Sequence, residues 1–124
     1  MREKEIFIED LKKRTKKLAI DIIELCNTLK PGTAANVIAY QIIKSSSSTG
    51  ANYRAACRAR SKAEFFSKIC IVVEESDETV YWLEIINDAK LTKKKEELQR
   101  LLQEAEEVTK IMSKARSSSY DKNK

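Results

Sequence analysis

The sequence contains no histidine, one proline, two glycines and no long apolar run. Without histidine it lacks the commonest general base and metal ligand, which excludes Ser-His and Cys-His nucleophile pairs and the Glu-x-x-His di-iron pattern of helical bundles. No apolar stretch reaches the roughly 18 residues that a membrane span needs, and the charged residues 1–5 are unlike a signal peptide. We therefore expect a cytoplasmic protein that is not an enzyme and does not enter a membrane.

Cysteine is scarce as well, with only Cys26, Cys57 and Cys70. An odd number of cysteines without a C-x-x-C pair argues against a disulfide framework or a zinc site. We expect each cysteine to occupy a position in or near the core as a small hydrophobic side chain. We expect no metal and no cofactor.

The residues that are present suit long amphipathic helices. Hydrophobic residues make up 42% of the 124 residues and charged residues 35%, and a chain of this length can bury one core without crosslinks. Positive charge is concentrated in the first half, where residues 1–62 hold 13 Lys and Arg against 6 Asp and Glu. A basic surface of this kind invites a polyanion such as nucleic acid.

Apolar residues at spacings of three and four predict four helices. The first covers residues 7–29 and ends before Pro31 and Gly32, after which Thr33 can cap the second. Residues 45–50, SSSSTG, allow two interpretations, a Ser-rich loop and a helix built from small residues. We favour the helix, because the core positions keep their heptad phase through this segment.

The third helix is predicted to begin at a capping box, Ser61 to Glu64, and to continue to about Asn87. It carries two apolar stripes, and a second stripe indicates burial on both sides of the helix. We therefore predict a subunit interface at Phe66, Val73, Tyr81 and Trp82.

A fourth helix, capped by Thr92, carries apolar residues at heptad-like spacing as far as Ala115. Short connections between long helices force neighbours to run antiparallel. The predicted fold is all-α, an antiparallel up-down-up-down four-helix bundle over residues 1–116. Residues 117–124 are polar and show no pattern, which predicts a disordered tail.

Acidic residues cluster in the third helix, at a level that hairpin geometry places beside the Ser-rich segment. One interpretation is a metal or acid–base site. The other is a hydrogen-bonded polar layer that fixes helix register, and the absence of histidine favours it. The predicted layer consists of Ser45, Ser48, Asn52, Glu74, Glu75 and Glu78.

The same topology brings cations of the first helix and of the second helix's end to one end of the bundle. We predict that this basic pole binds phosphate backbones without reading sequence, the alternative being an ordinary solvated surface. The predicted contact residues are Lys12, Lys13, Arg14, Lys16, Lys17, Arg54, Arg58, Arg60 and Lys62.

Two segments, TGANYRAACRARSKAEF at residues 49–65 and VVEESDETVYWLE at residues 72–84, carry a resemblance to a known family. Their pattern resembles the bacterial four-helix-bundle proteins encoded inside intervening sequences of large-subunit ribosomal RNA genes. The accessory variability determinant of diversity-generating retroelements is a relative of that family. The resemblance spans about residues 18–91.

The resemblance implies a four-helix bundle that forms a ring-like homo-oligomer, expected to be a pentamer. In the retroelement branch it implies association with nucleic acid and with a reverse transcriptase, so a reverse transcriptase or a ribosomal component is a candidate partner. The family supplies no established catalytic residues. The positions carried over, as structural and interface determinants, are Asn52, Arg58, Arg60, Phe65, Glu75, Glu78 and Trp82.

These patterns together predict a non-catalytic oligomeric scaffold that binds RNA or DNA through its basic pole without sequence specificity. A protein-interaction ring with no nucleic-acid role is the alternative. A helical metalloenzyme is the third candidate.

Overall fold

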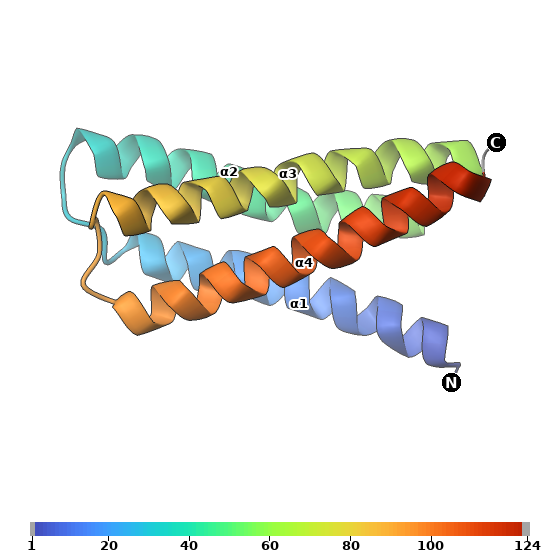
Figure 1. Cartoon of the computed structure of the whole chain (residues 1–124), viewed down its shortest axis with the longest axis horizontal. Helices are drawn as coiled ribbons and strands as arrows, with labels where there is room; N and C mark the ends of the chain where they lie inside the picture. The colour runs from blue at the N-terminus through green and yellow to red at the C-terminus, as the bar shows by residue number, and fades with distance from the viewer. Residues whose placement is uncertain (1, 123–124) are drawn as a thin grey trace.

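Four helices make up most of the computed structural model, which describes residues 2–122 (Figure 1). They are α1 (Glu3–Cys26), α2 (Thr33–Cys57), α3 (Lys62–Asp88) and α4 (Lys95–Lys122). Each packs against the helix that follows it in the chain, and consecutive helices run in opposite directions. No strand occurs within the described residues, and no helix there is long and apolar enough to cross a bilayer. The predicted up-down-up-down four-helix bundle is confirmed.

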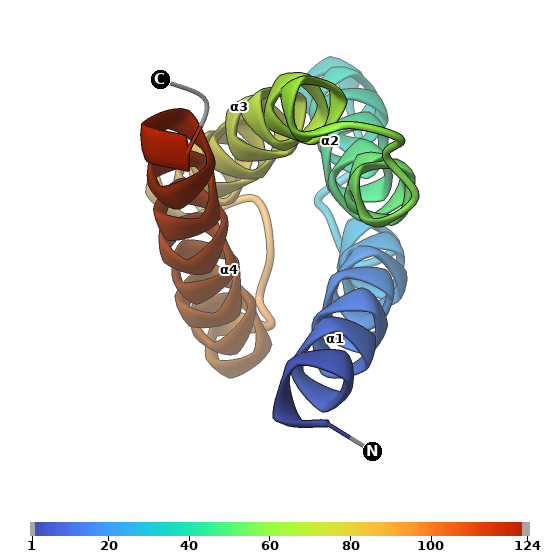
Figure 2. The same cartoon turned by 90° about the vertical axis from the view of Figure 1, so that its right-hand side faces the viewer.

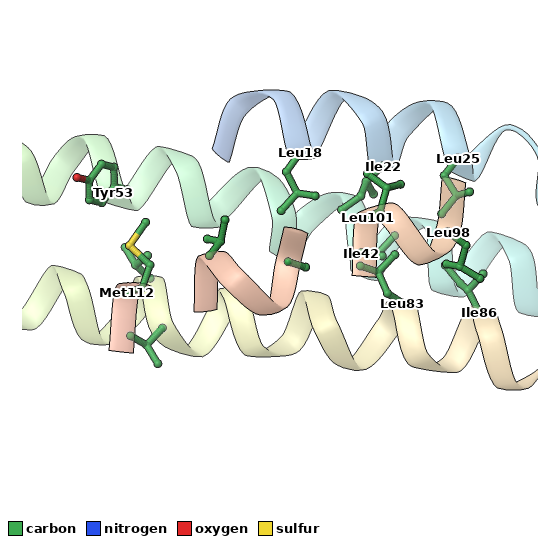
Figure 3. Close-up of a cluster of buried hydrophobic side chains, with 14 of the residues drawn as sticks. Leu18, Ile22, Leu25, Ile42, Tyr53, Leu83, Ile86, Leu98, Leu101 and Met112 are labelled. Carbon is green, nitrogen blue, oxygen red and sulfur yellow. The ribbon is translucent and has the colours of Figure 1, made fainter. Parts of the chain in front are cut away.

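One hydrophobic core runs along the bundle axis between the helices (Figure 3). Every helix contributes a stripe of side chains at spacings of three and four, as the sequence pattern predicts. Burying each large aliphatic side chain stabilises the fold by about 1.5–3 kcal/mol relative to leaving it exposed. The large hydrophobic side chains with no exposed surface are Ile22, Ile42, Ile69, Val72, Leu83, Ile86, Leu101, Val108 and Met112.

The Ser-rich segment is helical, so α2 continues through it without a break. Its buried hydroxyls bond to carbonyl oxygens of their own helix: Thr49 Oγ1 donates to the Ser45 carbonyl oxygen at 2.8 Å. A Cβ atom added at Gly50 would lie 3.2 Å from Thr15 Oγ1 of α1. The small residues therefore let α1 and α2 approach closely, and the helical interpretation is confirmed.

The helix ends follow the predicted caps only in part. Ser61 Oγ accepts a hydrogen bond from the Glu64 N–H at 3.0 Å, as the capping box predicts. Thr92 does not cap α4, which begins at Lys95. Its hydroxyl instead accepts from the Lys94 N–H and lies 2.7 Å from the hydroxyl of Thr28 in the α1–α2 connection. Thr92 therefore joins two connections at one end of the bundle.

The predicted disordered tail needs correction, because α4 continues to Lys122. The aromatic ring of Tyr120 lies on Phe66 of α3, with 5.7 Å between ring centroids. Ser119 Oγ donates to the Ala115 carbonyl oxygen at 2.8 Å. The contact between Tyr120 and Phe66 joins the last turns of α4 to α3, and residues 123–124 lie outside the described residues.

The bundle is not closed equally on all sides. We call the end that holds the α2–α3 turn, the start of α1 and the end of α4 the terminal pole. There α1 and α4 lie apart (Figure 2), and over their whole length they touch far less than the other neighbouring pairs. Toward the middle the two helices are joined by ion pairs, Arg14 to Glu104 and Arg100 to Asp21.

Candidate nucleic-acid interface

The predicted basic residues do not form one surface. The helical repeat of 3.6 residues turns the cations of α1 toward two different neighbours. Lys12, Lys13 and Lys16 lie on the side of α2, whereas Arg14 and Lys17 lie on the side of α4. The predicted pole is therefore divided into parts with different surroundings.

A surface groove of about 300 Å³ lies between α1 and α2, and we call it the basic groove. One wall is formed by successive turns of α1 and the other by two residues one turn apart near the end of α2. The groove therefore gathers cations separated by about forty positions in the sequence. Its lining residues are Lys12, Lys13, Lys16, Arg54, Arg58 and Glu9.

Most cations of the basic groove have no acidic partner. Lys12 bonds to Glu9 within α1, with 3.0 Å between Nζ and Oε2. Lys13, Lys16, Arg54 and Arg58 form no ion pair with any residue in the described part of the chain. An unpaired ammonium or guanidinium group can bond an incoming phosphate without first breaking an internal contact.

Arg14 belongs to a different structure, the salt-bridge network between α1 and α4. Its guanidinium donates two hydrogen bonds to Glu104, at 2.8 and 3.0 Å, and a third to Glu107 at 3.3 Å. The hydrogen bond to Glu104 is the main reason that the pKa of Arg14 is raised. Arg14 therefore holds two helices together, and its assignment to the basic pole is corrected.

Lys17 belongs to a second ion-pair cluster between α1 and α4, centred on a carboxylate that sequence reasoning overlooked. Buried Asp21 accepts from Lys17 Nζ at 3.1 Å and from Arg100 at 2.9 Å. Burial alone would raise the pKa of Asp21, but hydrogen bonds from Arg100 and Lys17 outweigh it and lower the pKa. The sequence offers one indication that Asp21 is buried: it precedes core residue Ile22 and lies on the edge of the apolar stripe.

Arg60 and Lys62 lie at the α2–α3 turn, outside the basic groove. The guanidinium of Arg60 lies 3.4 Å from a Glu64 carboxylate oxygen. Both basic residues instead line an apolar cleft at the terminal pole. Of the nine predicted contact residues, five therefore converge in one groove.

Polar contacts between the helices are made by hydroxyl groups, and of the predicted polar layer only Ser45 takes part in them. Thr79 Oγ1 donates to Ser45 Oγ at 2.9 Å between α3 and α2, and both side chains are buried. The hydroxyls of Ser76 and Thr109 lie 2.6 Å apart between α3 and α4. Asn52 bonds within its own helix, where Nδ2 donates to Ser48 Oγ and to its carbonyl oxygen, both at 2.9 Å.

The carboxylates assigned to that layer face outward, which corrects the prediction. Glu74 and Glu78 are exposed and Glu75 is half-buried. Burying an ionised carboxylate costs far more than burying a hydroxyl that can bond within its own helix. Partial burial, with Glu78 and Glu74 nearby, raises the pKa of Glu75. Within the described residues, no three His, Cys, Asp or Glu side chains lie together as a metal site would need.

The predicted interface residues are also divided by the structure. Val73 is 7% exposed and belongs to the chain's own core, so its assignment to a subunit interface is corrected. Phe66 is half-buried against Tyr120. Tyr81 remains on the surface at 54% exposure and packs edge-on against Trp82, with 5.2 Å between ring centroids. Of the four predicted interface residues, Tyr81 is therefore the one that is mainly exposed.

Comparisons with known proteins agree with this fold. A protein of unknown function from the S23 ribosomal protein family of Bacteroides thetaiotaomicron VPI-5482 has a similar structure. It is 29% identical, with a TM-score of 0.77 over 89% of this chain and 97% of that chain. A search of curated proteins finds no significant match. The family model of the 23S rRNA-intervening sequence protein matches residues 9–114. The chain therefore belongs to the 23S rRNA-intervening sequence protein family.

Proposed function

We propose that this protein is a non-catalytic oligomeric scaffold that binds nucleic acid through the basic groove. The observation that supports this proposal most strongly is the convergence of four unpaired cations, Lys13, Lys16, Arg54 and Arg58, from two helices. Because both walls are packed helices, the backbone is already ordered and only the side chains must be ordered when they bind a phosphate backbone. The family's name makes a fragment of 23S ribosomal RNA the first ligand to test.

Binding through this groove is proposed to be independent of sequence. Phosphate contacts fix position on a nucleic acid but carry no sequence information. The lining residues of the groove include no aromatic ring on which an unpaired base could stack. Electrostatic attraction to phosphates then supplies most of the affinity, which makes binding strongly dependent on salt.

The test is fluorescence anisotropy with a labelled 23S ribosomal RNA fragment and with a DNA duplex, repeated over a salt series. Four phosphate contacts predict a slope of about −3 to −4 in a plot of log K against log[salt] for the duplex. The variant K13A/K16A/R54A should reduce the magnitude of that slope by about 2.7, since each contact contributes about 0.9.

A matched control removes the same charge from the other end of the bundle. Lys93, Lys94 and Lys95 lie at the start of α4 and are exposed, so K93A/K94A/K95A changes the net charge equally. It should keep most of the affinity of the parent protein. Equal losses of affinity in the two triple variants would mean that binding depends on net charge and not on the basic groove. No binding of the parent protein at low salt would reject the nucleic-acid role.

The oligomeric part of the proposal concerns a different surface. Tyr81 exposes half of an aromatic side chain on α3 and packs against Trp82, and aromatic residues are enriched in interfaces. We propose a homo-oligomer, with a pentameric ring as the expected form, in which this pair is covered. Light scattering should give several subunits for the parent protein and fewer for Tyr81→Glu.

A mass of 14.2 kDa for the parent protein, that of one chain, would reject the oligomer. A stable oligomer without affinity for RNA or DNA would instead favour the protein-interaction ring. The two measurements thus separate the two candidate functions.

A further inference from the structure

An apolar cleft opens at the terminal pole, where α1 and α4 separate. Its volume is about 590 Å³, within the range of small-molecule binding sites. All four helices contribute to its lining. The large apolar and aromatic side chains that line it are Phe7, Ile8, Leu11, Tyr53, Phe65 and Ile111.

The exposure of the lining residues increases from the inner end of the cleft to its mouth. Leu11 and Tyr53 are only 2% and 5% exposed, whereas Phe7 at the start of α1 is 52% exposed. Small residues, among them Ala56 and Ala115, leave space between the larger side chains. The cleft is therefore a continuation of the bundle core that the chain's own helices leave unfilled, and apolar surface of this kind marks binding sites.

Charge at the rim of the cleft has one sign. Lys4, Arg60 and Lys62 line it, and none of its lining residues is acidic. Arg60 is paired with Glu64, but Lys4 and Lys62 form no ion pair with other described residues. Lys62 is also the first residue of α3, so the positive end of that helix dipole lies beside it. The rim complements a ligand with a single anionic group.

We propose that this cleft binds a single-chain anionic amphiphile, with the aliphatic chain among the apolar side chains and a carboxylate or phosphate head beside Lys4 and Lys62. The positive rim and a volume in the range of small-molecule sites both suit such a ligand. An extended aliphatic chain reaches the inner part of the cleft near Leu11.

This site is distinct from the basic groove. The groove is lined by Arg54 and Arg58 and the cleft by Tyr53 and Cys57, which lie on different sides of α2. Loss of nucleic-acid binding would leave the amphiphile proposal untouched, and the reverse also holds. Arg54→Glu serves as the variant that separates the two sites.

The first experiment is isothermal titration calorimetry of the full chain with four dodecyl compounds, each kept below its micelle concentration or solubility limit. Dodecanoate and dodecyl phosphate should bind, and the tighter of the two identifies the preferred head group. Dodecanol, which is neutral, and dodecyltrimethylammonium, which is cationic, should bind at least about tenfold more weakly, a ratio that corresponds to 1.4 kcal/mol. Equal affinity for dodecanol, or no binding of either anion, would overturn the proposal.

Cys57 provides a second measurement inside the cleft. It is half-buried and lines the cavity, so bound dodecanoate should slow its alkylation by iodoacetamide. Cys26 lies outside the cleft and is an internal reference, although burial raises the pKa of its thiol to about 11 and makes it react slowly. Unchanged alkylation of Cys57 at a saturating dodecanoate concentration would place the ligand elsewhere and contradict the proposal.

Variants locate both ends of the ligand. K4E/K62E should weaken dodecanoate binding about tenfold or more without weakening dodecanol binding, because only the head group meets the rim. Ala115→Phe should abolish binding of both by filling the cleft. Lys114→Glu and Arg54→Glu, each of which reverses one charge at an exposed residue outside the lining, should leave binding unchanged. Circular dichroism confirms that each variant is folded, and undiminished binding to K4E/K62E would refute the role of the rim.

Discussion

Replacing Gly50 with alanine has two effects on stability, which act in opposite directions and are of known size. Gly50 lies within α2, where alanine favours the helix by about 1 kcal/mol. The new Cβ would however lie 3.2 Å from Thr15 Oγ1 and 3.4 Å from Thr15 Cβ. Thr15 is 2% exposed and its hydroxyl bonds to the Leu11 carbonyl oxygen at 3.0 Å, so it cannot turn away without losing that bond.

The packing term should outweigh the helix propensity. Overpacking a well-filled site costs about 1–3 kcal/mol, so we expect Gly50→Ala to destabilise the protein by about 1 kcal/mol net. In a chain of this size that lowers Tm by roughly 4 °C. Urea unfolding followed by circular dichroism measures the change as a shift in midpoint at constant m value.

A double-mutant cycle isolates the contact. Thr15→Ala removes the oxygen nearest to the new Cβ, so Gly50→Ala in that background should stabilise the protein by about 0.5–1 kcal/mol. Ala51→Gly, at the exposed neighbouring position, calibrates the helix propensity of this segment. If Gly50→Ala stabilised the parent protein by the full propensity value, α1 and α2 would not be as close as the structure has them, and the reasoning would be refuted.

Three further substitutions should change the free energy of unfolding in a direction that the structure predicts. Lys90 has a φ of 57°, and the next residue's N–H bonds to the Ile86 carbonyl oxygen, so Lys90→Gly should raise the free energy of unfolding by about 0.5–1 kcal/mol in urea. Asp21→Asn should destabilise by about 1–2 kcal/mol at neutral pH. Because the folded-state pKa of Asp21 is lowered, its contribution is present above the unfolded-state pKa and is lost as pH falls through the folded-state pKa, so the two proteins should converge in acid. The folded-state pKa of Glu75 is raised, so its effect on stability has the opposite pH dependence. The stability it contributes is present in acid and is lost as pH rises through the folded-state pKa. Glu75→Gln should therefore stabilise the protein at neutral pH and have no effect in acid, and parallel pH profiles for either variant and its parent would contradict these assignments.

Hydrophobic periodicity predicts most of this fold, because each helix buries a stripe whose spacing is visible in the sequence. The same reasoning places the Ser-rich segment in α2, where Ser45 and Thr49 keep the phase of Ile38 and Ile42 and are buried as that phase requires. Composition alone would make the segment a linker. Phase is the better guide here because small hydroxyl residues can bond to carbonyl oxygens of their own helix.

Side-chain direction around the helix axis could not be predicted to the same extent. Arg14 and Lys16 are two residues apart, but they face α4 and α2 respectively. Periodicity shows which side of α1 is buried, but it does not show on which flank each neighbour lies. The division of the basic pole, and the network that holds Arg14, therefore required the structure.

Register and long-range contacts explain the other differences. Hairpin geometry placed the acidic cluster of α3 beside the Ser-rich segment, but the residue of α3 that bonds to Ser45 is Thr79. The end of α4 is held by contact between Tyr120 and Phe66, and no local pattern in residues 117–124 reports a partner so distant in sequence. The apolar cleft depends in the same way on how far α1 and α4 separate.

The two ends of the bundle differ in how they are fastened. At one end the hydroxyls of Thr28 and Thr92 are joined, and the Lys30 N–H donates to the Leu91 carbonyl oxygen at 2.7 Å. At the terminal pole α1 and α4 stand apart (Figure 2). Between the two ends the ion pair of Arg14 and Glu104 also ties α1 to α4. The width of the cleft is therefore set by the first turns of α1 and the last turns of α4, which lie beyond that ion pair.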